Sequence, residues 1–244
     1  MYRELPYPLD GAVVWTRGHA DRPYRQRILP DGCLDLIWAG GALLVAGPDT
    51  RAHLVDVAPG TRFAGVRFFP GQAPAVLGVP ADELRDRQVA LADLWSAGAT
   101  RRLLDRIEAA PRPAGGLAGA VAEQLRRCEP DRLARRVALL LRAGHPVAST
   151  AEAVGLSPRQ LQRRCLTAFG YGPKTLARVL RFDRALVQAR AGASFASVAA
   201  RAGYADQAHL ARDVRAMAGV PLRELVGPPG PGSPPEPGSP PEPG

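Results

Sequence analysis

The sequence predicts an α+β protein of two domains: a small N-terminal β barrel or sandwich with following helices, and a C-terminal all-α domain with tandem helix-turn-helix units. Three observations carry this prediction. Short apolar runs separated by turn formers fill residues 2–70, helical periodicity begins at Asp131, and one helical pattern occurs twice near the C-terminus. A chain of 244 residues is long enough for two modest domains.

Residues 1–97 are predicted to form the β-rich domain. Asp-Gly, Gly-Gly, Gly-Pro and Pro-Gly pairs divide residues 2–70 into apolar runs, a pattern typical of strands joined by tight turns. The runs are AVVWTRG, QRILPDGCLDLIWAGG, ALLVAGPDT, AHLVDVAPG and TRFAGVRFFPG. Helical spacing and loops mix after Pro70, so the strands are expected to end there.

A helical connector is predicted over residues 98–130. Its first helix covers residues 100–109, with Leu103, Leu104 and Ile107 facing inward, and its second lies near residues 119–128. The segment APRPAGG separates the two helices, because neighbouring prolines and glycines end a helix.

Helical periodicity continues over residues 131–227, the predicted DNA-binding domain. Asp131 is placed to cap a helix that ends at AGHP, and Pro173 opens a long helix that closes near Gly192. The apolar stripes are Leu133, Val137, Leu140 and Leu141 in the first helix, and Leu176, Val179, Leu180, Leu186 and Val187 in the second. Residues 228–244 are rich in proline, glycine, serine and glutamate and are predicted to be disordered.

A short helix, a turn and a longer helix occur twice in this domain, over residues 147–170 and 196–219. The copies contain GLSPRQLQRRCLTAFGYGP and GYADQAHLARDVRAMAGVP. Gly155 and Gly203 supply the left-handed conformation that a sharp helix exit needs, and Ser157 and Asp206 are placed as N-caps of the longer helices. This is the form of a helix-turn-helix, whose second helix enters the DNA major groove.

The longer helix of each copy separates an apolar face from a polar one. The inward stripes are Leu161, Cys165, Ala168 and Phe169 in the first copy, and Leu210, Val214 and Met217 in the second. The outward residues near the helix starts are Arg159, Gln162 and Arg163, then Gln207, Ala208, Ala211 and Arg212. Arginine and glutamine bond guanine and adenine edges bidentately, although such exposed side chains are also ordinary solvated helix residues.

The positive charge of the chain is concentrated in the same segment. Residues 1–130 hold 16 Lys and Arg against 15 Asp and Glu, whereas residues 131–227 hold 16 against 6. This asymmetry is typical of a protein that binds a polyanion. The candidate phosphate contacts are Lys174, Arg178, Arg181 and Arg184 on or near the long helix, and Ser149 and Ser197 near the starts of the short helices.

The long helix sets the distance between the two copies. About 18 residues at 1.5 Å per residue extend about 27 Å, and successive major grooves on one side of a duplex are about 34 Å apart. One chain is therefore expected to place both recognition helices in adjacent grooves of double-stranded DNA, with bending of the DNA where the spacing falls short.

Residues 132–226 resemble the DNA-binding domain of the AraC/XylS family of bacterial transcription regulators. GYADQAHLARDVRAMAGVP is a close version of the signature of the family's second unit. The resemblance implies base contacts from Arg159, Gln162, Arg163, Gln207, Ala208 and Arg212, although many members carry a polar residue where this chain has Ala208. LPDGCLDLIW, GVRFFPG and LGVPADELRDRQVALADLW resemble a β-rich domain found in a subset of the family, which implies a regulatory or sensory role.

The expected function is sequence-specific transcription regulation, without enzymatic activity and without a cofactor. The expected partner is double-stranded DNA; RNA polymerase, a small-molecule effector at the N-terminal domain and a second copy of the chain are further candidates. No stretch approaches the roughly 20 apolar residues that cross a bilayer, and the N-terminus lacks the pattern of a secretory signal. Three dispersed cysteines favour a reducing compartment, so a cytoplasmic protein is expected.

Two alternatives stay open at this level. One is a DNA-associated enzyme, either of the alkylation-repair kind or with a metal-dependent β-barrel domain; the repair chemistry needs four cysteine ligands, and only Cys33 lies in the β region. Asp31, Cys33, Asp35 and His53 are the cluster there that includes metal-binding side chains, but their spacing fits no zinc pattern, and Cys33 also suits a buried core position. The other alternative is a non-specific architectural DNA binder.

Aromatic residues of the β region allow two interpretations. They line an apolar pocket, or they pack in the core: Trp15, Trp38, Phe63, Phe68 and Phe69.

Overall fold

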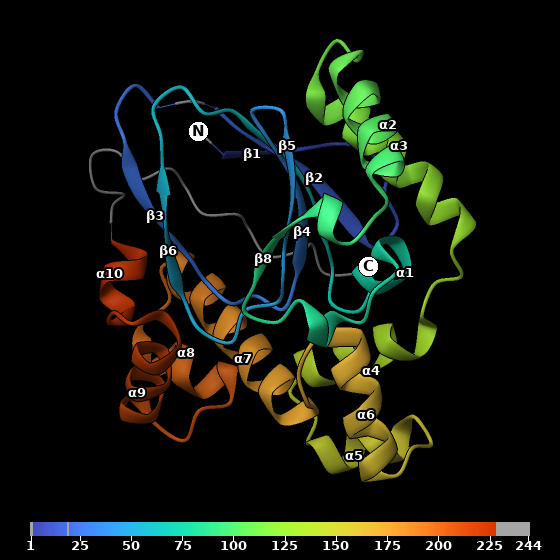
Figure 1. The fold of residues 1–244 in the computed structure, drawn as a ribbon. Helices are drawn as coiled ribbons and strands as arrows, with labels where there is room; N and C mark the ends of the chain where they lie inside the picture. Colours follow the sequence, from blue (N-terminus) through green and yellow to red (C-terminus); the bar gives the residue numbers. More distant parts are fainter. Residues whose placement is uncertain (1, 19, 228–244) are drawn as a thin grey trace.

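The computed structural model describes residues 2–18 and 20–227, so the tail predicted to be disordered lies outside the described residues. The N-terminal half contains two antiparallel sheets (Figure 1). The larger has the order β1-β2-β7-β4-β5-β8, with bounds Tyr2–Leu5, Ala12–Arg17, Phe63–Phe68, Leu34–Ala39, Ala42–Ala46 and Gln88–Ala90. The smaller pairs β3 (Tyr24–Ile28) with β6 (His53–Val57). The predicted β-rich N-terminal domain is confirmed.

The larger sheet has two different faces, because successive side chains of a strand point to opposite sides. Its core-side residues are almost fully buried: Leu34, Leu36, Val45, Val66 and Phe68. Its opposite face lines a cavity that the smaller sheet covers, with side chains that include Trp15, Arg17, Asp35, Phe63 and Arg67. One sheet thus supports both a hydrophobic core and a lined cavity.

Three helices cover the core side of the larger sheet: α1 (Ala73–Leu77), α2 (Ala97–Glu108) and α3 (Pro113–Arg127). The short 3₁₀ helices η1 (Ala81–Glu83) and η2 (Leu91–Asp93) precede α2. Leu103 and Ile107 of α2, with Leu117 and Val121 of α3, belong to the same apolar core as the strands. The segment predicted as a connector is therefore part of the core of the N-terminal domain.

α3 begins at Pro113, earlier than the predicted start near residue 119. A proline is tolerated in the first helical position, because its missing N–H would have no intrahelical partner there. Gly116 lies against α2, where an added Cβ would stand 2.8 Å from the Cα of Ile107. The glycines expected to end a helix instead allow α3 to approach α2 closely.

Two strands were not predicted. β1 has the sequence YREL, which contains no apolar run, and β8 spans three residues. Each is defined by antiparallel pairing to a neighbour, β1 to β2 and β8 to β5. Local sequence carries no sign of such pairing, since it depends on the strand alongside.

The C-terminal half is helical, as predicted. Its helices are α4 (Arg132–Arg142), α5 (Val147–Ala153), α6 (Pro158–Phe169), α7 (Pro173–Arg190), α8 (Phe195–Ala202), α9 (Gln207–Ala218) and α10 (Leu222–Val226). Two details of the predicted stripes were wrong. On α7, Val187 is 43% exposed, whereas its neighbour Leu186 is buried. On α4, Ala134 is buried, whereas Leu133 and Leu140 are half-buried. Among the described residues, no helix is both long and apolar enough to cross a membrane.

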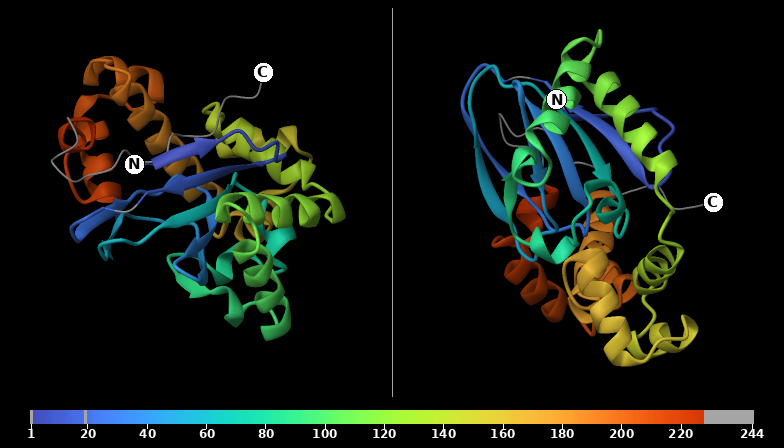
Figure 2. Two further views of the ribbon diagram at one scale, coloured as in Figure 1. Left: turned by 90° about the horizontal axis from the view of Figure 1, so that it is seen from above. Right: turned by 45° about the vertical axis from the view of Figure 1, so that its right-hand side comes forward.

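The C-terminal helices lie along one end of the β domain (Figures 1 and 2). Gly170, at the end of α6, contacts the N-terminal half so closely that an added Cβ would stand 2.6 Å from Pro48 Cγ and 2.9 Å from the carbonyl oxygen of Ala81. The next residue, Tyr171, is 2% exposed. The two halves are therefore in direct contact at the carboxyl end of α6.

Candidate nucleic-acid interface

The first helix-turn-helix unit joins α5 to α6 through a turn at Gly155, whose φ is 67°. Ser157 and Gln160 form a capping box at the start of α6. The Gln160 N–H donates to Ser157 Oγ at 3.3 Å, and the Ser157 N–H donates to Gln160 Oε1 at 2.9 Å. The box satisfies two backbone donors and fixes where α6 begins, which sets the position of its first exposed side chains.

The second unit joins α8 to α9 through Gly203, whose φ is 82°. Asp206 caps α9 by accepting a hydrogen bond from the His209 N–H at 2.6 Å. The His209 ring accepts the Ala205 N–H at Nδ1 and packs edge-on against Tyr204, with ring centroids 5.2 Å apart. α6 and α9 therefore both start at the caps that the sequence predicts.

Burial separates the two faces of α6 and α9 as predicted. The inward residues are buried: Leu161, Cys165, Ala168, Phe169, Leu210, Val214 and Met217. The candidate base-reading residues are exposed: Arg159, Gln162, Arg163, Gln207, Ala208 and Arg212. Contact of these exposed side chains with DNA bases stays a prediction.

Three arginines of α7 are engaged within the protein. Arg178 Nε donates to Asp213 Oδ1 at 2.6 Å, and Arg181 donates to the other carboxylate oxygen at 3.4 Å. Arg184 donates to the carbonyl oxygens of Arg142 and Ala202. These bonds hold α8 and α9 on α7, and Arg178 and Arg181 are the partners of the buried Asp213 carboxylate. Phosphate contact by the three arginines stays a prediction.

Other cations of the two units lack such partners. Within residues 2–18 and 20–227, no hydrogen bond or ion pair engages the side chains of Arg159, Arg163, Lys174 and Arg212. Ser149 is exposed in the first turn of α5. The Ser197 N–H already donates to Ser194 Oγ at 3.3 Å, because Ser194 rather than Ser197 caps α8.

Comparison with known proteins agrees with this geometry. Residues 150–226 match the family described as "Helix-turn-helix domain". These residues are an AraC-type helix-turn-helix domain. Residues 12–90 match a second family, described as "Domain of unknown function (DUF6597)". No curated protein matches the chain. The AraC-type domain supports a DNA-binding transcriptional regulator.

Solved structures of ToxT from Vibrio cholerae are similar in arrangement but distant in sequence. One such structure is 9% identical, covers 88% of this chain and 97% of its own, and has a TM-score of 0.49. ToxT bound to (E)-4-(8-methylnaphthalen-1-yl)but-3-enoic acid has the same identity, the same coverage and the same score. ToxT with a bound unsaturated fatty acid is also 9% identical, with coverage of 88% and 94% and a TM-score of 0.47.

The N-terminal half bonds the carboxyl ends of α6 and α9 in the AraC-type domain. Arg27 donates to the carbonyl oxygen of Ala218, at the end of α9, at 2.8 Å, and Arg85 donates to that of Gly170, at the end of α6, at 3.3 Å. The Ala52 N–H donates to the Met217 carbonyl oxygen at 2.6 Å. The last carbonyls of a helix lack intrahelical donors and carry partial negative charge, which suits arginine.

A groove on the AraC-type domain is bordered by both halves of the chain. Thr50 and Arg85 of the N-terminal half line it together with Gln162 and Lys174. The Gln162 side chain lies over Gly172, where an added Cβ would stand 2.5 Å from Oε1. Two candidate DNA-contacting residues thus share a surface with the N-terminal domain.

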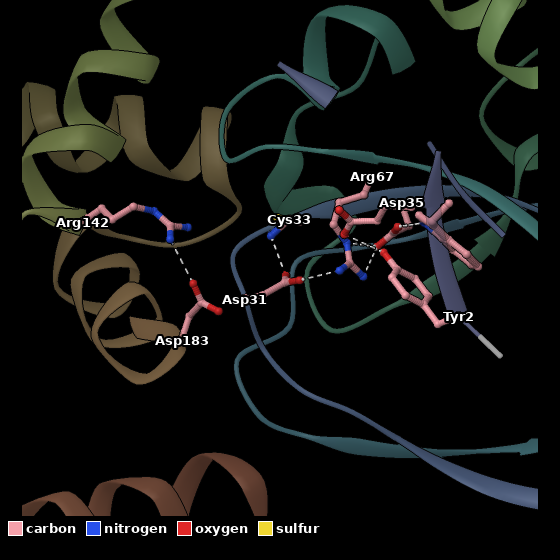
Figure 3. Close-up of polar contacts among 9 residues, drawn as sticks. Tyr2, Asp31, Cys33, Asp35, Arg67, Arg142 and Asp183 are labelled. Carbon is pink, nitrogen blue, oxygen red and sulfur yellow. Dashed lines mark hydrogen bonds and ion pairs between the residues drawn. The ribbon is translucent and has the colours of Figure 1, made fainter. Parts of the chain in front are cut away.

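A buried ion cluster lies in the cavity between the two sheets (Figure 3). Arg67 donates to Asp35 Oδ2 at 3.2 Å, and its NH1 lies 3.4 Å from Asp31 Oδ2. Trp15 Nε1 donates to Asp35 Oδ1 at 2.7 Å. Burial of Arg67 opposes its charge, but the two carboxylates outweigh that effect and raise its pKa well above the ordinary value. The carboxylates considered as metal ligands therefore hold a guanidinium.

The remaining residues of that candidate metal cluster are used differently. Cys33 is 4% exposed, and burial raises the pKa of its thiol well above the ordinary value, which keeps the thiol protonated and unreactive. His53 lies 3.4 Å from Asp49. No three His, Cys, Asp or Glu side chains of the described residues converge as metal ligands would. Of the aromatic residues, Trp15 and Phe63 line the cavity, whereas Phe68 is in the core.

Proposed function

We propose that this protein is a transcription regulator that reads a specific DNA sequence with two recognition helices, α6 and α9, in adjacent major grooves. The observation that carries the proposal is the matched presentation of unpaired arginines. Arg163 and Arg212 occupy aligned positions in the two copies, both are exposed, and neither has a partner among the described residues. Such side chains are free to bond base edges bidentately.

The spacing of the two units supports a shared duplex. α7 spans 18 residues between them, which is about 27 Å and close to the roughly 34 Å between successive major grooves. Lys174, unpaired at the start of α7, and Ser149, at the start of α5, are placed to contact phosphates beside the first unit. Ser197 occupies the corresponding position in the second unit, where its hydroxyl is available although its N–H is used.

The N-terminal domain is proposed to modulate DNA binding. Arg27 and Arg85 link it to the ends of α9 and α6, so a change in the β domain alters the support of both recognition helices. A ligand of the β domain and a second copy of the chain are the candidate partners that would act through this link, and RNA polymerase is a further candidate partner of the protein.

Selection of bound sequences from a random duplex library tests the proposal. Wild-type protein is expected to enrich a bipartite site, with binding that weakens steeply as salt rises because phosphate contacts release counterions. Arg163→Ala and Arg212→Ala are each expected to cost about 1–3 kcal/mol and to relax selection in one half of the site only. Arg126→Ala, an exposed arginine on α3, is the matched control and should leave selection unchanged.

Two outcomes of the selection experiment would contradict the proposal. Equal affinity for random and selected duplexes, or unchanged selectivity in both recognition-helix variants, would falsify the assignment of α6 and α9.

A further inference from the structure

Gly172 precedes the long helix α7, in the position where a helix usually carries a capping side chain. Its φ of −67° and ψ of 165° are open to any residue, and it has no side chain with which to cap α7. Four other helices of the AraC-type domain, α4, α6, α8 and α9, begin at a serine or aspartate that does cap them. Neither the backbone conformation nor the helix start therefore explains a glycine here.

The space beside Gly172 is filled by the side chain of Gln162. A Cβ added at Gly172 would stand 2.5 Å from Oε1 of Gln162, 2.6 Å from its Nε2 and 2.9 Å from its Cδ. The amide thus occupies the volume that any larger residue at this position would take. Since the amide is the far end of a flexible side chain, a larger residue is expected to displace it without disturbing the backbone.

The Gln162 amide is available to DNA. The side chain is exposed, and within the part of the chain that the structure describes its amide makes no hydrogen bond. It lines a groove together with Lys174, a candidate phosphate contact. A side chain that is already held in place loses less rotamer freedom on binding, which is worth roughly 2- to 10-fold in affinity.

The second unit does not repeat this arrangement. The positions aligned with Gln162 and Gly172 are Ala211 and Pro221. The larger residue of the pair lies on the recognition helix in the first unit, whereas in the second unit it is Pro221, which precedes α10. Alanine has no side-chain donor or acceptor, so this position offers a hydrogen bond to DNA on α6 and offers none on α9.

We propose that Gly172 is a positioning residue for base recognition: it leaves the space from which the Gln162 amide bonds one adenine in the half-site of α6. A glutamine amide matches the N6 and N7 edge of adenine with two hydrogen bonds. The inference rests on the proposed function and deepens it, because the two half-sites are then read differently at positions that are aligned in the two copies.

Selection from a random duplex library with wild type, Gln162→Ala, Gly172→Ser and the double variant tests the inference. Wild type is expected to prefer adenine at one base pair of the α6 half-site, and Gln162→Ala should reduce that preference roughly fivefold or more. Gly172→Ser should reduce it to a similar extent, because the added Cβ displaces the amide. In the Gln162→Ala background the serine should cause no further loss, since no amide remains to be displaced.

A second measurement separates positioning from damage to the fold. Gly172→Ser should unfold at or above the temperature of wild type, because serine caps a helix at least as well as glycine does. Gly98→Ser, near the start of α2, is the matched control for the substitution, since a Cβ there would lie 3.4 Å from Arg102 Nη1, at the edge of ordinary contact. This control should select the same sequences as wild type.

The proposal is overturned if Gly172→Ser selects the same sequences as wild type, or if it changes selection to the same extent in the Gln162→Ala background. It is also overturned if Gln162→Ala keeps the adenine preference. A wild-type protein that enriches no sequence rejects the proposed function as well, whereas enrichment by wild type with an unchanged Gly172→Ser variant rejects this inference alone.

Discussion

At the scale of single residues, Asp213 shows how one carboxylate organises the second DNA-binding unit. It is 8% exposed and accepts hydrogen bonds from Arg178 at 2.6 Å, from the Tyr204 hydroxyl at 3.1 Å and from Arg181 at 3.4 Å. Arg181 also stands over the Tyr204 ring, 4.6 Å from its centroid. The network joins α7, α9 and the turn after α8 through one acid.

Replacement of Asp213 by alanine is expected to destabilise the protein by about 2–3 kcal/mol, because two arginines and a tyrosine hydroxyl lose their partner while Arg178 stays partly solvated. Chemical denaturation of the full chain measures the change. Glu224→Gln, an exposed acid on α10 without an ion pair among the described residues, should alter the midpoint little. A loss as small for Asp213→Ala as for this control would show that the network contributes nothing.

Asp49 makes the folding stability of the protein depend on pH. Burial, reinforced by Asp31, Asp86 and Asp35, raises its pKa to about 8, whereas an aspartate in an unfolded chain titrates near 3.9. The unfolded state therefore releases this proton first, so this residue lowers stability as pH rises from about 4 to about 8 and has a constant effect above that range.

Asn at position 49 removes this penalty. Asp49→Asn should unfold at a higher temperature than wild type at about pH 8, and the difference should shrink toward about pH 5. Thermal unfolding across this range measures it, with Asp93→Asn, an exposed residue in η2, as control. A stability difference that does not change with pH would mean that Asp49 is solvated.

At the scale of elements, the starts of the recognition helices follow from local sequence. The start of α6 is encoded within four consecutive positions, so the cap can be predicted without tertiary information. Ser157 and Gln160 accept hydrogen bonds from free backbone N–H groups, and Pro158 has no N–H to satisfy. The faces of α6 and α9 follow from periodicity in the same way. The start of α3 was predicted too far along the chain, because Gly116 lies inside the helix and allows it to pack closely against α2. β1 was not predicted, because it is defined by its pairing with β2.

The capping box provides the prediction at this scale. Ser157→Ala is expected to reduce the free energy of unfolding by about 1 kcal/mol, since the Gln160 N–H loses its acceptor. Ser149→Ala, on α5, should have a smaller effect, because its side chain makes no hydrogen bond among the described residues. Equal changes in denaturation midpoint for the two variants would remove the box as a determinant of stability.

At the scale of the whole molecule, the N-terminal domain meets both recognition helices at their carboxyl ends. Arg27 and Ala218 are 191 positions apart, and Arg85 and Gly170 are 85 apart. No periodicity or motif reports contacts of this kind, because they depend on how two folded domains pack. The same is true of the ion pair between Arg178 and Asp213, which lie 35 positions apart.

The two contacts predict how strongly the DNA affinity of the protein depends on the spacing between the two half-sites. If the β domain fixes α6 relative to α9, one base pair inserted between the half-sites should weaken wild-type binding sharply, since it rotates them by about a tenth of a turn. The double variant Arg27→Ala, Arg85→Ala should tolerate the insertion better while binding a single half-site as wild type does. Arg62→Ala, an exposed arginine of the same domain, is the control for lost charge. If wild type and the double variant lose the same affinity when the half-site spacing changes, α7 alone sets the distance between α6 and α9, because that helix is then the sole rigid link between the two units.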